Sequence, residues 1–193
     1  MKPSPADVLR YAASQALSAP SIHNTQPWRF TLETDDRGEL LKIQADPARQ
    51  LMVLDPRRRQ LTISCGCAVL HARIAIEASG YTALVDRLPA PADRDTVALV
   101  RLGTEREYPA SQELNAVTGQ RHTNRKQFSA EAVPSEVREE LIAIAAEEGA
   151  FLRAVSHAQE HDLVAGMGAT AERLEHADRA YHDEMHSWKA TWQ

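Results

Sequence analysis

The sequence predicts an α+β protein, because helical and strand-like patterns are mixed along its 193 residues. Apolar residues recur at steps of three and four in several segments, which is the spacing of amphipathic helices. Short apolar runs bounded by turn residues indicate strands that can pair antiparallel. Apolar residues make up 43% of the chain and charged residues 25%, which is the balance of a globular protein.

The first element is expected to be a helix that begins after Ser4. Ser4, Pro5 and Asp7 have the spacing of a capping box with proline at the first helical position. Pro20 ends the element. Its apolar residues are Val8, Leu9, Ala12, Ala16 and Leu17.

Strands are expected in two regions of the chain. Residues 28–32 and 40–43 flank a turn at residues 35–38, which ends on glycine. Residues 82–88 and 96–102 are two further strand-like runs, and a proline-rich loop separates them. The antiparallel-containing sheet would pack with helices.

Further helices are expected at residues 58–79, near Ser111 and at residues 135–148. Gly80 and Gly149 end the first and the last of these. Residues 151–155 resemble a short strand. The predicted core face of the first helix is Ile63, Cys67, Leu70, Ile74 and Ala78.

The end of the chain has the pattern of one long amphipathic helix. Its apolar residues are Leu163, Met167, Leu174, Ala177, Tyr181, Met185, Trp188 and Trp192. The pattern reaches the last residue without a capping residue, so the apolar stripe should pack on something. We expect either that the natural chain continues, which we favour, or that this helix forms a partner interface such as a homodimer.

Composition and charge exclude several classes of function. The net charge of −5 argues against nucleic-acid binding, which needs a basic surface. No apolar run approaches the length of a membrane helix and no signal peptide is evident, so the sequence predicts a cytoplasmic protein without a membrane partner. Arg57, Arg58 and Arg59 are interpreted as a solvated face in an acidic protein.

Neither metal binding nor thiol chemistry is favoured. Cys65 and Cys67 lack the spacing of a zinc or redox motif, so buried structural thiols are the simpler interpretation. His182 and His186 have the i, i+4 spacing of a metal pair, but the residue between them that a zincin needs as glutamate is Asp183. An exposed polar helix face explains them more simply, and no metal is predicted.

Residues 19–30 carry the strongest functional signal. Two prolines stiffen this segment, while Ser21, Asn24, Thr25 and Gln26 supply neutral donors and acceptors. No carboxylate or thiol is present to act as an acid, base or nucleophile. The set suits a neutral, planar, hydrogen-bonding ligand, although a helix-to-strand turn with side-chain caps would use the same residues.

A second segment, residues 121–125, is basic. The guanidinium groups of Arg121 and Arg125, with Thr123 between them, could hold a phosphate or lie beside a developing anion. A solvated basic turn would have the same composition.

Together the two segments resemble the FMN-dependent nitroreductase family. Residues 20–28, Pro-Ser-Ile-His-Asn-Thr-Gln-Pro-Trp, are similar to the family's P-S-x-x-N-x-Q-P-W signature. Residues 121–125 are similar to its R-[RH]-[ST]-x-[RK] motif, and residues 61–80 and 121–153 resemble the family more broadly.

The order of the two motifs resembles one branch of that family. In ordinary members the basic motif precedes the signature loop, whereas here it follows about a hundred residues later. That order resembles the fused-repeat, Acg-type branch of actinobacteria. The resemblance implies a first repeat over residues 1–110 and an incomplete second repeat over residues 111–193. The place of a second signature is taken by residues 147–151, so one site can be assembled, and a C-terminal segment of the family is expected to be missing.

The resemblance also implies cofactors and residue roles. The family binds FMN and uses NAD(P)H to reduce quinone- or nitro-type acceptors, with the protein orienting the cofactor. By position, Ser21 and Asn24 would contact FMN, while Gln26 and Trp28 would shape its loop. Arg121 and Thr123 would hold the phosphate or ribityl chain.

The last implied residue is Arg125, which would lie near the flavin edge that gathers negative charge on reduction. No side chain is expected to be a general base. Two other functions stay open at this point. One is a non-catalytic protein that binds or sequesters FMN, and the other is a degenerate interaction module.

Overall fold

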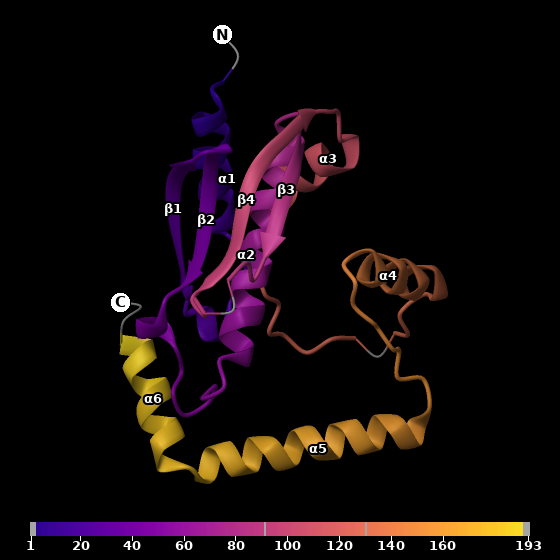
Figure 1. The fold of residues 1–193 in the computed structure, drawn as a ribbon. Coiled ribbons are helices and arrows are strands. Elements are labelled where there is room, and N and C mark those ends of the chain that lie inside the picture. Colours follow the sequence, from indigo (N-terminus) through magenta and orange to yellow (C-terminus); the bar gives the residue numbers. More distant parts are fainter. Residues whose placement is uncertain (1–2, 91, 130, 191–193) are drawn as a thin grey trace. The chain divides into compact units, whose positions relative to one another are not determined.

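The computed structural model describes residues 3–90, 92–129 and 131–190 (Figure 1). It divides into two compact units, one of Met1–Thr123 with Ser187–Gln193 and one of Asn124–His186. The first unit contains a sheet packed with helices, which confirms the α+β prediction. The division into repeats stays a prediction.

The sheet has four antiparallel strands in the order β1-β2-β4-β3. The strands are β1 (Trp28–Asp35), β2 (Gly38–Ala45), β3 (Tyr81–Arg87) and β4 (Thr96–Glu105). All four predicted strands are present, and β1, β2 and β4 extend beyond their predicted ends. The β1–β2 turn needs Gly38, because its φ of 104° is unfavourable for other residues.

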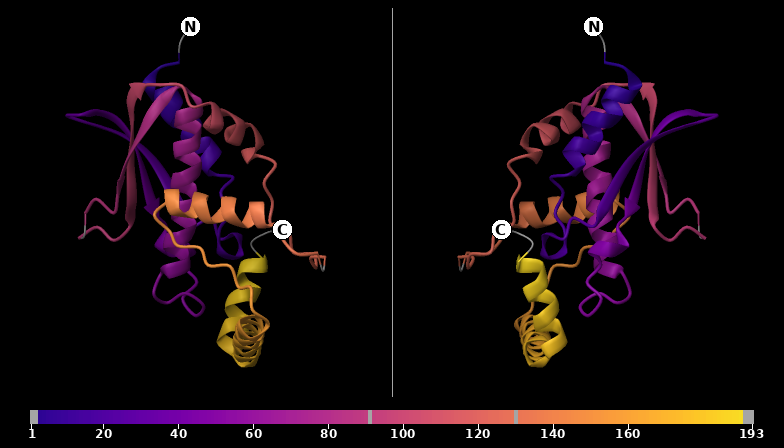
Figure 2. Two further views of the ribbon diagram at one scale, coloured as in Figure 1. Left: turned by 90° about the vertical axis from the view of Figure 1, so that its right-hand side faces the viewer. Right: turned by 90° about the vertical axis from the view of Figure 1, so that its left-hand side faces the viewer.

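The helices that lie wholly in the first unit are α1 (Pro5–Ala16), α2 (Arg59–Ala78) and α3 (Pro109–Thr118). The predicted capping box is confirmed, since the Ser4 hydroxyl accepts from the Asp7 backbone N–H and the Asp7 carboxylate accepts from that of Ser4. Helices α1 and α2 cover the same face of the sheet (Figure 2). Leu9, Leu41 and Ile76 are fully buried between these layers.

The predicted core face of α2 is wrong. Ile63 is 53% exposed, and Cys67, Leu70, Ile74 and Ala78 are only partly buried. The deeply buried positions are Leu61, Ser64, Cys65, Ala68, Val69, His71, Ala72, Ala75 and Ile76. Most of these are small, and small residues allow close packing between layers, a signal that a search for large apolar residues overlooks.

Helix α2 passes a length and hydropathy test for membrane spans, although the sequence shows no continuous apolar run of that length. Its 20 residues have a mean hydropathy of 1.4 over the best window, enough by length and composition to cross a membrane. Half of that window is buried inside the protein, which is the behaviour of a core helix. Its isoleucines, cysteines and alanines raise the average without forming one continuous run of large apolar residues.

The second unit contains α4 (Ser135–Glu147), α5 (Ala158–Ala177) and the first turns of α6 (Arg179–Ala190). The prediction of one long C-terminal helix is wrong, because Asp178 adopts an extended conformation and its carboxylate accepts from the Ala180 N–H at 2.8 Å. Trp192 lies outside the described residues. Residues 151–156 are irregular and not a strand, since no other strand in the described part of this unit could pair with them.

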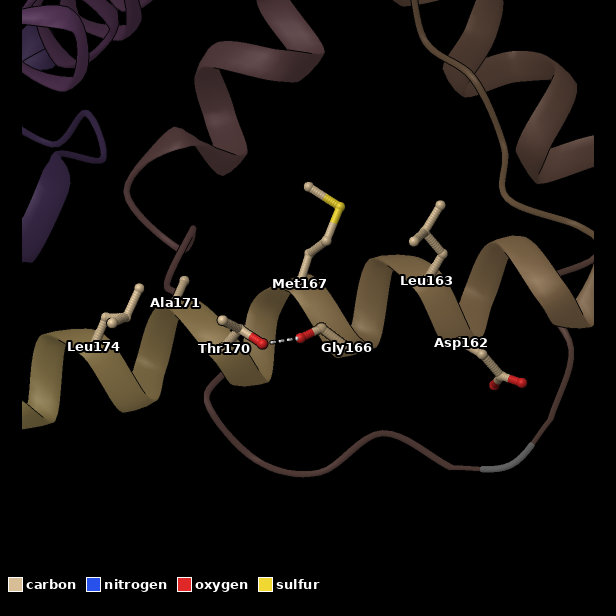
Figure 3. A pocket seen from close by; sticks show the side chains of 7 residues that line it. All are labelled: Asp162, Leu163, Gly166, Met167, Thr170, Ala171 and Leu174. Atoms are coloured by element: carbon tan, nitrogen blue, oxygen red, sulfur yellow. Dashed lines mark hydrogen bonds between the residues drawn. The ribbon is translucent and has the colours of Figure 1, made fainter.

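Helix α5 has no buried residue and presents a row of apolar side chains to one side (Figure 3). Leu163, Met167 and Leu174 are each at least 65% exposed. The predicted apolar periodicity is therefore present, but no described residue buries the apolar row that it forms on α5. The homodimer through the C-terminal helix stays a prediction.

Candidate functional site

The loop between α1 and β1 has a strained backbone. It includes a single 3-10 turn, Ile22–Asn24, and three non-glycine residues in the left-handed region: His23, Asn24 and Gln26, with φ of 42°, 53° and 48°. Each such residue costs about 1–2 kcal/mol relative to ordinary backbone. A conformation of this kind persists only when its surroundings hold it in place.

Helix α2 supplies two of the contacts that hold the loop. The Ile22 N–H donates to the Ser64 hydroxyl at 3.1 Å, and the Cys65 thiol donates to the Pro27 carbonyl at 3.2 Å. Burial raises the pKa of the Cys65 thiol to about 12, so this cysteine stays protonated and keeps its donor. Cys65 is thus a buried structural thiol, as the sequence predicts, whereas Cys67 is only partly buried.

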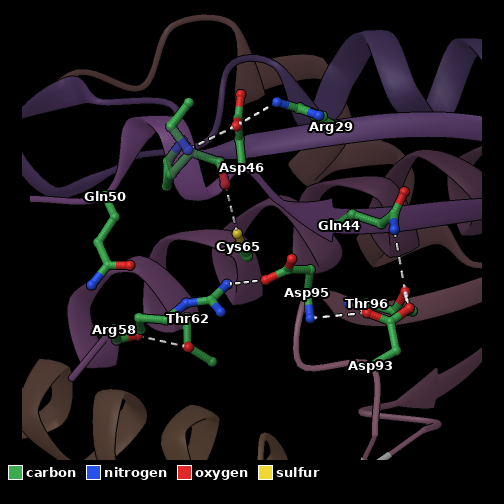
Figure 4. A network of polar contacts seen from close by, with 12 residues as sticks. Arg29, Gln44, Asp46, Gln50, Arg58, Thr62, Cys65, Asp93, Asp95 and Thr96 are labelled. Atoms are coloured by element: carbon green, nitrogen blue, oxygen red, sulfur yellow. Dashed lines mark hydrogen bonds and ion pairs between the residues drawn. The ribbon is translucent and has the colours of Figure 1, made fainter. Parts of the chain in front are cut away.

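The segment after β2 holds the other side of the loop. The Arg49 guanidinium donates to the Thr25 carbonyl at 2.9 Å. Asp46, just before the 3-10 turn Pro47–Arg49, accepts from Arg29 at 2.6 Å, and its own N–H donates to the Pro27 carbonyl (Figure 4). The signature segment is therefore held by α2 at Ile22 and Pro27 and by the segment after β2 at Thr25 and Pro27.

The loop residues that this arrangement leaves exposed to solvent are polar and uncharged. Asn24 and Gln26 are exposed, and their side-chain amides have no hydrogen-bond partner among the described residues. The Ser21 hydroxyl accepts from the Gln26 N–H at 2.9 Å and is partly exposed. Thr25 is 1% exposed, and its hydroxyl also lacks a partner within the described chain. The loop therefore offers a set of unused neutral donors and acceptors.

Trp28 faces the core. It is 7% exposed, and its ring lies 6.4 Å from that of Phe30, centroid to centroid. It can shape the loop from beneath, but its ring is not presented on the surface.

The basic segment contacts the first residues of the loop between α1 and β1 through a hydrogen bond. Arg121 donates from Nη2 to the Ser18 carbonyl at 3.4 Å, across 103 positions of sequence. The Ser18 hydroxyl lies 3.3 Å from Nδ1 of His71 on α2. Burial, and secondarily the Arg121 charge, lower the pKa of His71, which favours its neutral form.

The other two predicted basic-segment residues are less constrained. Thr123 is exposed and belongs to the first unit, while Arg125 is exposed and belongs to the second unit. Arg121 is thus the one residue of this segment for which a contact with the loop is recorded in the described structure.

Sequence reasoning missed the residues that hold the loop, namely Arg49, Ser64 and His71. The residue types of Ser64 and His71 gave a weak signal for such a role, since a serine and a histidine that are buried in a helix must find hydrogen-bond partners. Their partners are 24 to 53 positions away in sequence, so spacing could not identify them.

Comparison with curated proteins gives relatives over almost the whole chain. "Putative NAD(P)H nitroreductase Rv3131" of Mycobacterium tuberculosis is 32% identical over 188 residues, which are 97% of this chain and 52% of that protein. "Putative NAD(P)H nitroreductase acg" of the same organism is 28% identical over 188 residues, 97% of this chain and 55% of that protein. The chain spans about half the length of the curated relatives it matches.

Solved structures similar to this chain include a nitroreductase family protein from Clostridium difficile 630. It has 16% identity and a TM-score of 0.43, with 69% of this chain and 90% of that chain covered. No protein-family model matches the chain. The resemblance that the signature loop and the basic segment predict is confirmed by the curated relatives: the chain is a homologue of the mycobacterial proteins named NAD(P)H nitroreductase, Acg among them.

Proposed function

We propose that this chain contributes the FMN site of an NAD(P)H-dependent oxidoreductase of the nitroreductase type, with quinone- or nitro-type compounds as acceptors. The observation that carries the proposal is the contact between Arg121 and Ser18. It brings the basic segment beside Ser18, two residues before the signature begins at Pro20, although about a hundred residues of sequence separate them. The homology to proteins named NAD(P)H nitroreductase supports the same reaction class.

The donor set of the loop fits a flavin. An isoalloxazine ring presents carbonyls and ring nitrogens along one edge, and neutral amides and hydroxyls are suitable partners for them. The amides of Asn24 and Gln26 and the hydroxyl of Ser21 are available on the loop. The unpartnered hydroxyl of Thr25 agrees with a loop whose hydrogen-bonding capacity is not used within the protein itself.

Arg121 supplies the charge that FMN requires. A guanidinium group can hold a phosphate through two parallel hydrogen bonds, and Arg121 is exposed enough to reach one. When bound, FMN would supply hydride transfer from NAD(P)H to the acceptor. The residues of this chain would bind and orient it, with Thr123 at the ribityl or phosphate group. For Arg125, the resemblance of the basic segment to the family motif is what implies a place beside the ring edge that becomes negative. None of them is required to move a proton.

Replacing Arg121 tests the site. We expect Arg121→Ala to raise the Kd for FMN about tenfold or more, because a charge-assisted phosphate contact contributes about 1.5–3 kcal/mol. Flavin fluorescence titration measures the Kd. Arg121→Lys should lose less affinity for FMN than Arg121→Ala. Arg138→Ala on exposed α4 is the matched control and should leave the Kd unchanged. An unchanged Kd in Arg121→Ala would contradict the assignment.

Oxidation of NAD(P)H separates a reductase from a protein that only binds FMN. We expect anaerobic addition of NADH or NADPH to bleach the flavin absorption of the FMN-loaded protein, followed by recovery on addition of a quinone. Bound flavin that neither nucleotide bleaches would contradict the reductase and leave FMN sequestration.

A further inference from the structure

A cavity of about 270 Å³ lies where α2 begins, beside the loop that follows β3. Three arginines, one aspartate and three uncharged residues line it: Arg57, Arg58, Thr62, Leu88, Ala90, Asp93 and Arg94. The arginine run that the sequence suggests is a solvated face is therefore divided by the fold. Two of its members line this cavity together with Arg94 from a distant segment.

The three arginines differ in whether their charge is paired. Arg58 donates to the Asp95 carboxylate at 2.5 Å, so its charge is compensated and its position fixed (Figure 4). Arg57 and Arg94 are exposed, and neither has an ion pair or side-chain hydrogen bond with any described residue. Two guanidinium groups without a partner thus face one small cavity from two segments.

The aspartate of the lining forms no ion pair with Arg57 or Arg94 among the described residues. Asp93 Oδ2 accepts from the Thr96 hydroxyl at 2.5 Å, and Oδ1 accepts from the N–H groups of Asp95 and Thr96. These hydrogen bonds lower the pKa of Asp93 and tie both of its oxygens to the loop. Asp93 stays ionised, and Asp95 pairs with Arg58, so the three arginines still outnumber the carboxylates at the cavity by one.

The backbone N–H groups at the start of α2 are not available to an anion in this cavity. The Asp55 carboxylate accepts from the N–H groups of Arg59 and Leu61, each at 2.8 Å, and so caps the helix. An anion would be held by side chains. Arg58 and Leu88 have φ of 61° and 50°, so the backbone is strained on both sides of the cavity.

We infer that this cavity binds a small organic phosphate, with the phosphate between Arg57 and Arg94. Paired guanidinium groups match the oxygens of a phosphate. Leu88 is 61% exposed and, with Ala90, forms an apolar wall beside the arginines. This combination favours a phosphate ester with an apolar substituent over free phosphate. The inference is independent of the proposed FMN site, which uses Arg121 and the α1–β1 loop.

Calorimetric titration with phenyl phosphate and with inorganic phosphate tests the inference. We expect phenyl phosphate to bind the full chain more tightly than inorganic phosphate, and R57Q/R94Q to weaken its binding about tenfold or more. The double variant R37Q/R138Q removes the same charge elsewhere and should bind like the wild type. Leu88→Ser should abolish the preference for phenyl phosphate.

Several results would overturn the inference. These are no binding of phenyl phosphate by the wild type, equal binding by R57Q/R94Q, equal loss in the control pair, or no preference over inorganic phosphate. If R57Q/R94Q alters the circular dichroism spectrum, the single variant R94Q in the exposed loop replaces it. That variant should still bind phenyl phosphate more weakly than the wild type.

Discussion

Single residues hold the signature loop in a conformation that its own sequence does not favour. Three non-glycine residues in the left-handed region are kept there by Ser64, Cys65 and Arg49, all distant in sequence. Strain concentrated in one loop and supported from outside it is typical of binding sites. The amides left outward are the residues that the sequence predicts for FMN.

His71 gives a residue-scale prediction about pH. Burial lowers its folded-state pKa below the unfolded value of about 6.5, so the unfolded protein binds more protons in that range. The free energy of unfolding should therefore decrease as the pH falls from 7.5 to 5.5. His71→Gln should flatten this dependence in denaturant titrations at the two pH values, whereas exposed His157→Gln should not. An equally steep decrease in His71→Gln would contradict the account.

At the scale of elements, α2 depends on one buried cap. Asp55 is 5% exposed and satisfies two N–H groups at the start of the helix. We expect Asp55→Ala to lower the free energy of unfolding by about 1–2 kcal/mol, because both groups lose their partner. Chemical denaturation monitored by circular dichroism measures it. Asp36→Ala, in the exposed β1–β2 turn, should change it by less than about 0.5 kcal/mol, and equal effects would contradict the cap.

Local signals predicted most elements correctly, and non-local packing caused the errors. The capping box at Ser4, the turn ending on Gly38 and the breaks at Gly80 and Gly149 are short-range devices that the sequence displays directly. The core face of α2 is set by α1, α3 and the sheet together, and small residues such as Ala68 and Ala72 carry no size signal. The break at Asp178 was hidden because the apolar spacing continues across it.

For the candidate site, the sequence identified the segments that resemble flavin motifs but not what positions them. The signature residues are contiguous, so a pattern of nine positions was sufficient to find them. The contact of Arg121 with Ser18 and the support from Ser64 and Arg49 depend on the tertiary fold. No spacing along the chain encodes these pairs.

At the scale of the whole molecule, the first unit contains the sheet, the core and the loop, whereas the second contributes helices with exposed apolar rows. Both units align with the curated relatives, since 97% of this chain is matched. The self-association predicted through the C-terminal helix would cover the row of Leu163, Met167 and Leu174 on α5.

The visible absorption spectrum of the purified chain, recorded after mixing with FMN and desalting, tests the central claim most directly. The account predicts a retained flavin spectrum at close to one FMN per chain, and a loss of that retention in Arg121→Ala. A colourless wild-type protein after desalting, with the same far-ultraviolet circular dichroism as before, would contradict the claim that the signature loop and Arg121 form an FMN site in this chain.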